Sequence, residues 1–131
     1  MIPIKVKILT LPETERWCLK RLKSINSTIR LDAIFTLYEI GTTSTEEIIP
    51  LLDDEDYRVR ALAAKLLGNW GNKSIEPKLL DKLNDKHWLV QGNVIFALGK
   101  IGVTGGIEQV RQILRSKNHG FVEFACSTAF K

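Results

Sequence analysis

The chain has 131 residues, of which 44% are hydrophobic and 26% are charged, and its formal net charge is +4. This balance excludes an intrinsically disordered chain, because the apolar share is high and the net charge is small. No apolar run is long enough to span a bilayer, and the two cysteines, Cys18 and Cys126, cannot make a disulfide framework. We therefore expect one folded domain in the reducing cytoplasm.

An internal repeat with a period of 30 or 31 residues runs along the chain. Residues 37–41, 67–71 and 98–102 read Leu-Tyr-Glu-Ile-Gly, Leu-Gly-Asn-Trp-Gly and Leu-Gly-Lys-Ile-Gly, and hydrophobic residues elsewhere keep the same register. Agreement at several independent positions indicates tandem structural units. The expected organisation is a lead-in at 1–11 followed by repeats at 12–41, 44–71, 74–102 and 104–131.

Each repeat predicts a pair of α-helices. In the second repeat, hydrophobic residues fall at i, i+4, i+7, i+8 and i+11, which is one face of a helix; they are Val59, Ala63, Leu66, Leu67 and Trp70. The glycine that follows is a natural stop, because glycine adopts the left-handed conformation at low cost. We expect first helices near 12–23, 45–53, 74–84 and 105–116, and second helices near 26–40, 56–70, 87–101 and 118–130.

Start signals precede the first helices. A hydroxyl residue with a glutamate three positions later is typical of a capping box. The candidate caps are Thr10 (with Glu13), Ser44 (with Glu47), Ser74 and Thr104. Proline is tolerated in the first turn of a helix, where Pro12 and Pro77 are expected, whereas Pro50 lies deeper and predicts a kink.

A helix pair of this length cannot bury both of its apolar faces, so each pair needs neighbours. We therefore predict an all-α fold, a right-handed α-solenoid of about four helix pairs. Small residues such as Ala63, Gly68 and Ala97 would let helices approach closely, while Leu67 and Trp70 would fill the remaining core space.

Residues 51–71 resemble a HEAT repeat of the short type that also occurs in phycobilisome lyases, and looser similarity extends from about residue 13 to residue 131. In that family an acidic residue caps the second helix, and an arginine four residues later lines an inner ladder. The resemblance assigns these roles to Asp56 and Arg60, and it matches Asn26 and Arg30 in the first repeat. The equivalent positions of the third and fourth repeats hold other residues: His87 and Gln91, Asn118 and Val122. The resemblance implies a binding scaffold rather than an enzyme.

Motifs for catalysis, cofactor binding and metal binding are absent from the sequence, which has no P-loop, no GxGxxG fingerprint and no HExxH helix. We expect no enzymatic activity, no cofactor and no metal. His87 and His119 lie about one repeat apart but lack a third ligand, so we expect His87 to cap a helix. Cys18 and Cys126 lie at core-like positions. The acidic run at 53–56 lacks the ligand spacing of a calcium loop and favours a helix N-terminus.

The binding surface is expected on the concave side, which the second helices usually line in such solenoids. Aromatic side chains beside lysine and arginine are the mixture that dominates binding energy at interfaces. We select aromatic or basic residues of the second helices: Phe35, Tyr57, Arg58, Arg60, Lys65, Trp88, Phe96 and His119. The alternative for each aromatic residue is packing between repeats.

These observations favour a non-enzymatic scaffold that binds a protein or peptide on its concave face. Two alternatives stay open. The resemblance allows an accessory subunit of a bilin chromophore lyase or another assembly factor, and analogy with glycosylases built from HEAT-like repeats allows a nucleic-acid-binding module. Residues 42–71 have a net charge of −3 and interrupt the basic flanks, which disfavours a continuous phosphate-binding stripe.

The last helix carries a large apolar face that includes Phe121, Phe124 and Phe130. A solenoid needs a polar outer face on its terminal unit. We therefore expect self-association or a partner to cover this helix, unless the chain belongs to a longer repeat array.

Overall fold

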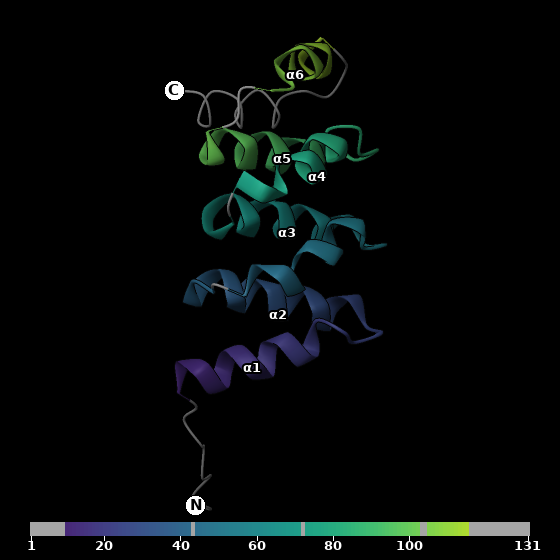
Figure 1. Ribbon diagram of the computed structural model, residues 1–131. Helices are drawn as coiled ribbons and strands as arrows, with labels where there is room; N and C mark the ends of the chain where they lie inside the picture. Colours follow the sequence, from purple (N-terminus) through teal and green to yellow (C-terminus); the bar gives the residue numbers. More distant parts are fainter. Residues whose placement is uncertain (1–9, 43, 72, 103–104, 116–131) are drawn as a thin grey trace, which may run out of the picture.

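Helices stacked in two layers make up the computed structural model, which describes residues 10–42, 44–71, 73–102 and 105–115 (Figure 1). Within these ranges the chain forms helices and turns and no strand, which confirms the predicted all-α solenoid. The expected helix at 118–130, which holds His119, Cys126 and the three phenylalanines, lies outside the described residues, as does Thr104. The α-helices are α1 (Leu11–Arg21), α2 (Ser27–Ile40), α3 (Tyr57–Trp70), α4 (Glu76–Lys82), α5 (Trp88–Ile101) and α6 (Ile107–Leu114), and the 3-10 helices are η1 (Thr45–Glu47), η2 (Ile49–Asp53) and η3 (Lys73–Ile75).

The helices α2, α3 and α5 are the second helices of their repeats, and we call them the second-helix layer. Each has 14 residues and begins and ends within a residue or two of its expected bounds. The glycines that end α2 and α5, Gly41 and Gly102, adopt the expected left-handed conformation, with φ of 73° and 83°. Gly71, after α3, is extended instead.

The first helix, α1, begins with the predicted capping box. The Thr10 hydroxyl accepts a hydrogen bond from the Glu13 backbone N–H at 3.3 Å, and the Glu13 carboxylate accepts one from the Thr10 N–H at 2.9 Å. Pro12 lies in the first turn, where its missing N–H leaves no partner unsatisfied. Cys18 is fully buried in this helix, as its position predicted.

The first helix of the second repeat is not the α-helix expected at 45–53. Two short 3-10 helices, η1 and η2, replace it, and Pro50 lies in the first turn of η2 rather than kinking a longer helix. The predicted cap at Ser44 is also wrong. Its hydroxyl donates to Glu15 of α1 at 2.9 Å, and Thr42 donates to the same carboxylate, so these side chains bind the previous repeat instead.

The third repeat also begins with a 3-10 turn. Ser74 lies inside η3 and is not the cap of the following α-helix, whose N-cap is Ile75. Pro77 falls in the first turn of α4, as expected. The first helices of the repeats, which include α1, η1, η2 and α4, are shorter than the second helices and form the first layer of the stack, opposite the second-helix layer.

The helices α3 and α5, from neighbouring repeats, pack closely against each other. A Cβ atom added to Gly68 would lie 2.6 Å from the Cα of Ala97, which is too short for two non-bonded carbons. The predicted role of small residues is therefore confirmed here. Leu67 is buried as expected, but Trp70 is half exposed and lies against Gly41 at the edge of the stack rather than in the core.

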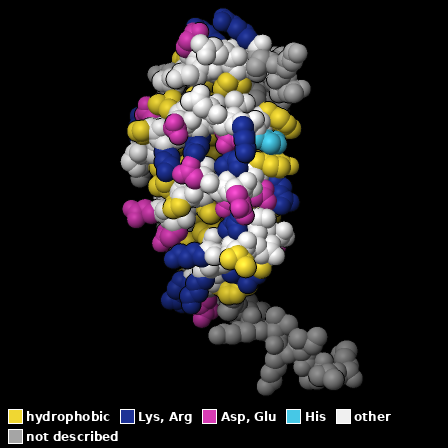
Figure 2. Space-filling model, turned by 90° about the vertical axis from the view of Figure 1, so that its right-hand side faces the viewer, with side chains coloured by type: hydrophobic (Ala, Val, Ile, Leu, Met, Phe, Trp, Pro, Cys, Tyr) yellow, Lys and Arg dark blue, Asp and Glu magenta, His cyan; other side chains and the backbone are white. Residues whose placement is uncertain are grey.

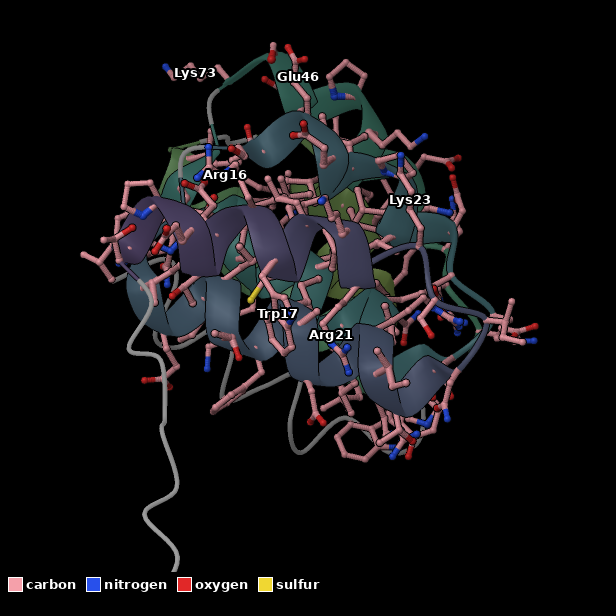
Figure 3. All side chains as sticks on the ribbon, turned by 90° about the horizontal axis from the view of Figure 1, so that it is seen from below. Arg16, Trp17, Arg21, Lys23, Glu46 and Lys73 are labelled. Atoms are coloured by element: carbon pink, nitrogen blue, oxygen red, sulfur yellow. The ribbon has the colours of Figure 1, made fainter. Side chains whose placement is uncertain are left out.

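The N-terminal end of the stack is closed by α1 (Figure 3). Trp17 and Arg21 leave the same side of this helix, and the Arg21 guanidinium carbon lies 4.4 Å from the centre of the Trp17 ring. Trp17 remains half exposed beside this cation–π contact. In the described part of the chain, no helix combines the length and the hydropathy needed to cross a membrane.

Candidate functional site

Two buried arginines of the second-helix layer connect the first repeat to the second and the second repeat to the third. Arg30 donates from Nε and Nη2 to the Asp54 carboxylate at 2.8 and 2.9 Å. Arg60 donates in the same way to Asp85, at 2.8 and 3.2 Å. The inner arginine ladder implied by the family resemblance is therefore present, and its partners are aspartates 24 and 25 residues further along the chain.

Arg60 had been predicted to anchor a partner, and its position corrects that prediction. Only 6% of the residue is exposed. Besides the bond to Asp85, its Nη1 donates to the backbone carbonyls of Asp54 and Glu55 at 2.8 and 3.3 Å. A guanidinium whose N–H groups are directed inward in this way holds the fold and is not available to a ligand.

The ladder aspartates also order the turns that precede the second helices. Asp54 accepts from the backbone N–H of Asp56, and Asp85 accepts from that of His87, each at 2.9 Å. The ladder ends in the third repeat, where Gln91 replaces the arginine and donates to the Leu83 carbonyl at 3.1 Å. The replacement of arginine by glutamine in the sequence therefore coincides with the end of the arginine ladder in the structure.

Aromatic side chains gather at the start of α3 and α5. His87 is the predicted cap, because its Nδ1 accepts from the Leu89 N–H at 3.1 Å. Its ring also stacks on Tyr57, with centroids 3.8 Å apart, and lies 5.6 Å from the Trp88 ring. Tyr57 and Trp88 are 39% and 43% exposed. Figure 2 faces this edge and shows hydrophobic side chains above and below the cyan histidine.

The Asp56 carboxylate caps α3 and holds Arg58 beside it. It accepts from the Arg58 backbone N–H at 2.9 Å and from the guanidinium at 2.7 and 3.1 Å. The Arg58 side-chain hydrogen bond, more than any other contact, keeps the pKa of Asp56 far below its usual range. The ionised form of this carboxyl is therefore favoured in the folded state.

This pKa shift predicts part of the acid sensitivity of the fold. A carboxyl whose folded pKa is lowered contributes stability that is present above its unfolded pKa of about 3.9 and is lost as the pH falls below it. Asp56→Asn keeps a capping side chain, as Asn26 does for α2, but removes this titration. We expect thermal unfolding from about pH 5 to pH 2 to show a shallower loss of stability in the variant. Equal slopes would contradict the assignment.

A groove opens between α2, α3 and α5, with a volume of about 290 Å³. Its floor is apolar, and two cations and one amide stand around it, without any carboxylate in the lining. The lining residues are Leu31, Arg58, Ala61, Leu62, Lys65, Leu89 and Asn93. Three consecutive repeats therefore contribute to one cavity on the second-helix layer.

Sequence reasoning found only part of this groove. Arg58 and Lys65 were predicted and line it, whereas Leu62, Leu89 and Asn93 were not selected. The selection was restricted to aromatic and basic residues, which left the leucines out, although the equivalence of Leu62 and Asn93 in the repeat register is the signal that these positions share one surface.

The remaining predicted residues lie elsewhere. Phe35 is 53% exposed on α2, and Phe96 is partly buried on α5 beneath Lys100, whose Nζ lies 5.8 Å from the ring centre. Neither residue lines the groove, and His119 lies outside the described residues. Among the residues that the structure describes, no three histidine, cysteine or acidic side chains gather as metal ligands.

A larger hollow, about 550 Å³, lies over the turn before α3. Four consecutive residues, 55–58, line it, and the Asp56–Arg58 pair occupies its polar groups. The groove is the better candidate site, because three helices of different repeats hold its walls in place and its floor is apolar.

Comparison with protein-family models matches residues 45–130, about two thirds of the chain, to the family described as HEAT repeats. The matched region includes α3, α5 and most of the groove lining, whereas α1 and α2 precede it. A search of curated proteins finds no match.

Proposed function

Because the chain belongs to the HEAT-repeat family, we propose that it is a non-enzymatic scaffold that binds a segment of a partner protein in the groove between α2, α3 and α5. HEAT repeats generally mediate interactions between proteins. The groove is selected as the binding site because its floor is apolar and residues from three repeats contribute to it.

The size of the groove supports a protein segment over a small molecule. Pockets that enclose small ligands have volumes of about 300–1,000 Å³. The groove, at about 290 Å³, lies at the lower edge of that range and is open to solvent along the helix layer. Such a cavity suits one or two apolar side chains of a longer segment. The exposed aromatics Tyr57 and Trp88 lie at the starts of the helices that carry Arg58 and Leu89 and would extend the contact.

Truncating the groove floor tests this proposal. A random peptide library is selected on the immobilised protein, and the affinity of each enriched peptide is measured by fluorescence anisotropy. We expect Leu62→Ala to weaken binding by about tenfold, because the apolar contact of the floor is lost. The matched control is Leu11→Ala, the same truncation at an exposed position of α1.

Circular dichroism and a thermal melt show whether each variant remains folded. Peptides that bind wild type, Leu62→Ala and Leu11→Ala equally well would contradict the proposed site. A selection that enriches no peptide above an unrelated immobilised protein would contradict the proposed function.

A further inference from the structure

Positive and negative charges are separated between the two layers of the second repeat. Its carboxylates include Glu46, Glu47 and Asp53, which lie on η1 and η2 in the first layer. Asp53 is paired there with two lysines of α4, Lys78 at 3.3 Å and Lys82. The groove side of the same repeat instead presents Arg58 and Lys65. A repeat that is acidic overall therefore offers a basic surface to the groove.

The two cations of the groove differ in how far they are already neutralised. Arg58 is held by Asp56 in a two-pronged ion pair. Lys65 lies with its Nζ 5.2 Å from the centre of the Tyr38 ring, and Asn69 donates to the Tyr38 hydroxyl at 3.1 Å, which fixes that ring. Within the described ranges, no carboxylate forms an ion pair with Lys65. A charge held in place beside an apolar floor is a preorganised site for an anionic group.

We propose that the groove takes an acidic, apolar segment of a partner protein, in which a leucine-sized side chain lies on the floor and a neighbouring carboxylate pairs with Lys65. This inference rests on the proposed function and names the chemistry of its partner. The apolar floor recognises the side chain by burial, and the lysine recognises the charge beside it.

Flanking charges of the same helix layer give the bound segment a direction. On α2 the exposed acidic residues are Asp32 and Glu39, whereas α5 carries exposed Lys100. In the repeat register Asp32 corresponds to Leu62 and Asn93, so it belongs to the groove side of its helix. Carboxylates of the segment therefore lie over α3 and α5, and its neutral or basic end lies over α2.

A polypeptide fits these features better than a nucleic acid. Phosphate binding draws its affinity from several cations along a track, and each contributes to the salt dependence. Here two cations stand over a floor of leucine and alanine side chains, and one of the two is already paired. Leucine floors favour apolar side chains, whereas nucleobases are bound by stacking on aromatic rings.

The test uses three fluorescent peptide pools of about 12 residues, with the same leucine-containing apolar pattern and glutamate, glutamine or lysine at all other positions. Anisotropy is measured with the full chain at about 0.05 M and 0.5 M salt. We expect the glutamate pool to bind about tenfold more tightly than the glutamine pool at low salt, and the difference to shrink at high salt.

Lys65→Glu is expected to remove this preference. Lys73→Glu is the matched control, because it makes the same charge change at an exposed residue of η3 that does not line the groove, and Figure 3 shows Lys73 on the same side of the stack as Glu46 of η1. Equal binding of the glutamate and glutamine pools, or equal effects of the two substitutions, would overturn the inference. So would tighter binding of a single-stranded DNA of about 20 nucleotides that Lys65→Glu abolishes. If peptides bind without charge preference but still respond to Leu62→Ala, the proposed function stands and only the acidic partner fails.

Discussion

Replacing Arg60 with alanine is expected to destabilise the fold by about 3–5 kcal/mol, because it leaves a buried carboxylate without its partner. Asp85 has a side chain only 7% exposed, and its ion pair with Arg60 joins the second repeat to the third. The substitution also removes the hydrogen bonds that Arg60 donates to the carbonyls of Asp54 and Glu55. Urea denaturation followed by circular dichroism measures the loss.

Arg58→Ala is the matched control for this prediction. It removes the same side chain and charge two residues away, but the Arg58–Asp56 pair is solvent-exposed on the arginine side, so we expect a loss of no more than about 1 kcal/mol. The double variant Arg60→Ala with Asp85→Ala should lose less than the sum of the two single losses. Similar losses for Arg60→Ala and Arg58→Ala would show that the ladder does not hold the repeats together.

Replacing Gly68 with valine is expected to destabilise the fold by about 3 kcal/mol, the upper end of what overpacking usually causes. The first added carbon alone would lie 2.6 Å from the Ala97 Cα and 2.8 Å from its Cβ. Because backbone atoms form one side of this contact, α3 and α5 must move apart. The small gain in helix propensity over glycine, well under about 1 kcal/mol, does not offset this strain.

The control for Gly68→Val is Glu39→Val, which places the same β-branched residue on the exposed face of α2. We expect that variant to lose less than about 1 kcal/mol, from helix propensity alone. A Gly68→Val protein as stable as Glu39→Val would contradict the close contact between α3 and α5.

The second helices could be predicted from the sequence because their signals are local. A polar cap, a stripe with a period of 3.6 residues and a terminal glycine recur in each repeat, and all lie within one helix. The first helices carry weaker signals. Pro50 and the preference of Ser44 for Glu15 of the neighbouring repeat broke the expected helix at 45–53 into 3-10 turns. The proline is a local signal, but the bond between Ser44 and Glu15 is a tertiary contact, which the local pattern does not contain.

The candidate site was only partly predictable for a related reason. Charge suggests exposure, so Arg60 was placed on the surface, whereas its burial depends on Asp85 in the next repeat. The register offered a signal for this, since Asp54 and Asp85 occupy equivalent positions and each precedes a cap by two residues. Summing charge over residues 42–71 likewise hid the separation of acidic and basic residues between the two layers.

The groove between α2, α3 and α5 is the proposed binding site for a protein segment, and nuclear magnetic resonance tests this directly. A library-selected peptide is titrated into the isotope-labelled chain, and changes in the backbone amide signals are mapped on the helices. The predicted result is a set of largest changes around Leu31, Leu62 and Leu89, with little change on η1, η2 and α4. Changes centred on that first layer instead, or on α1, would contradict the account.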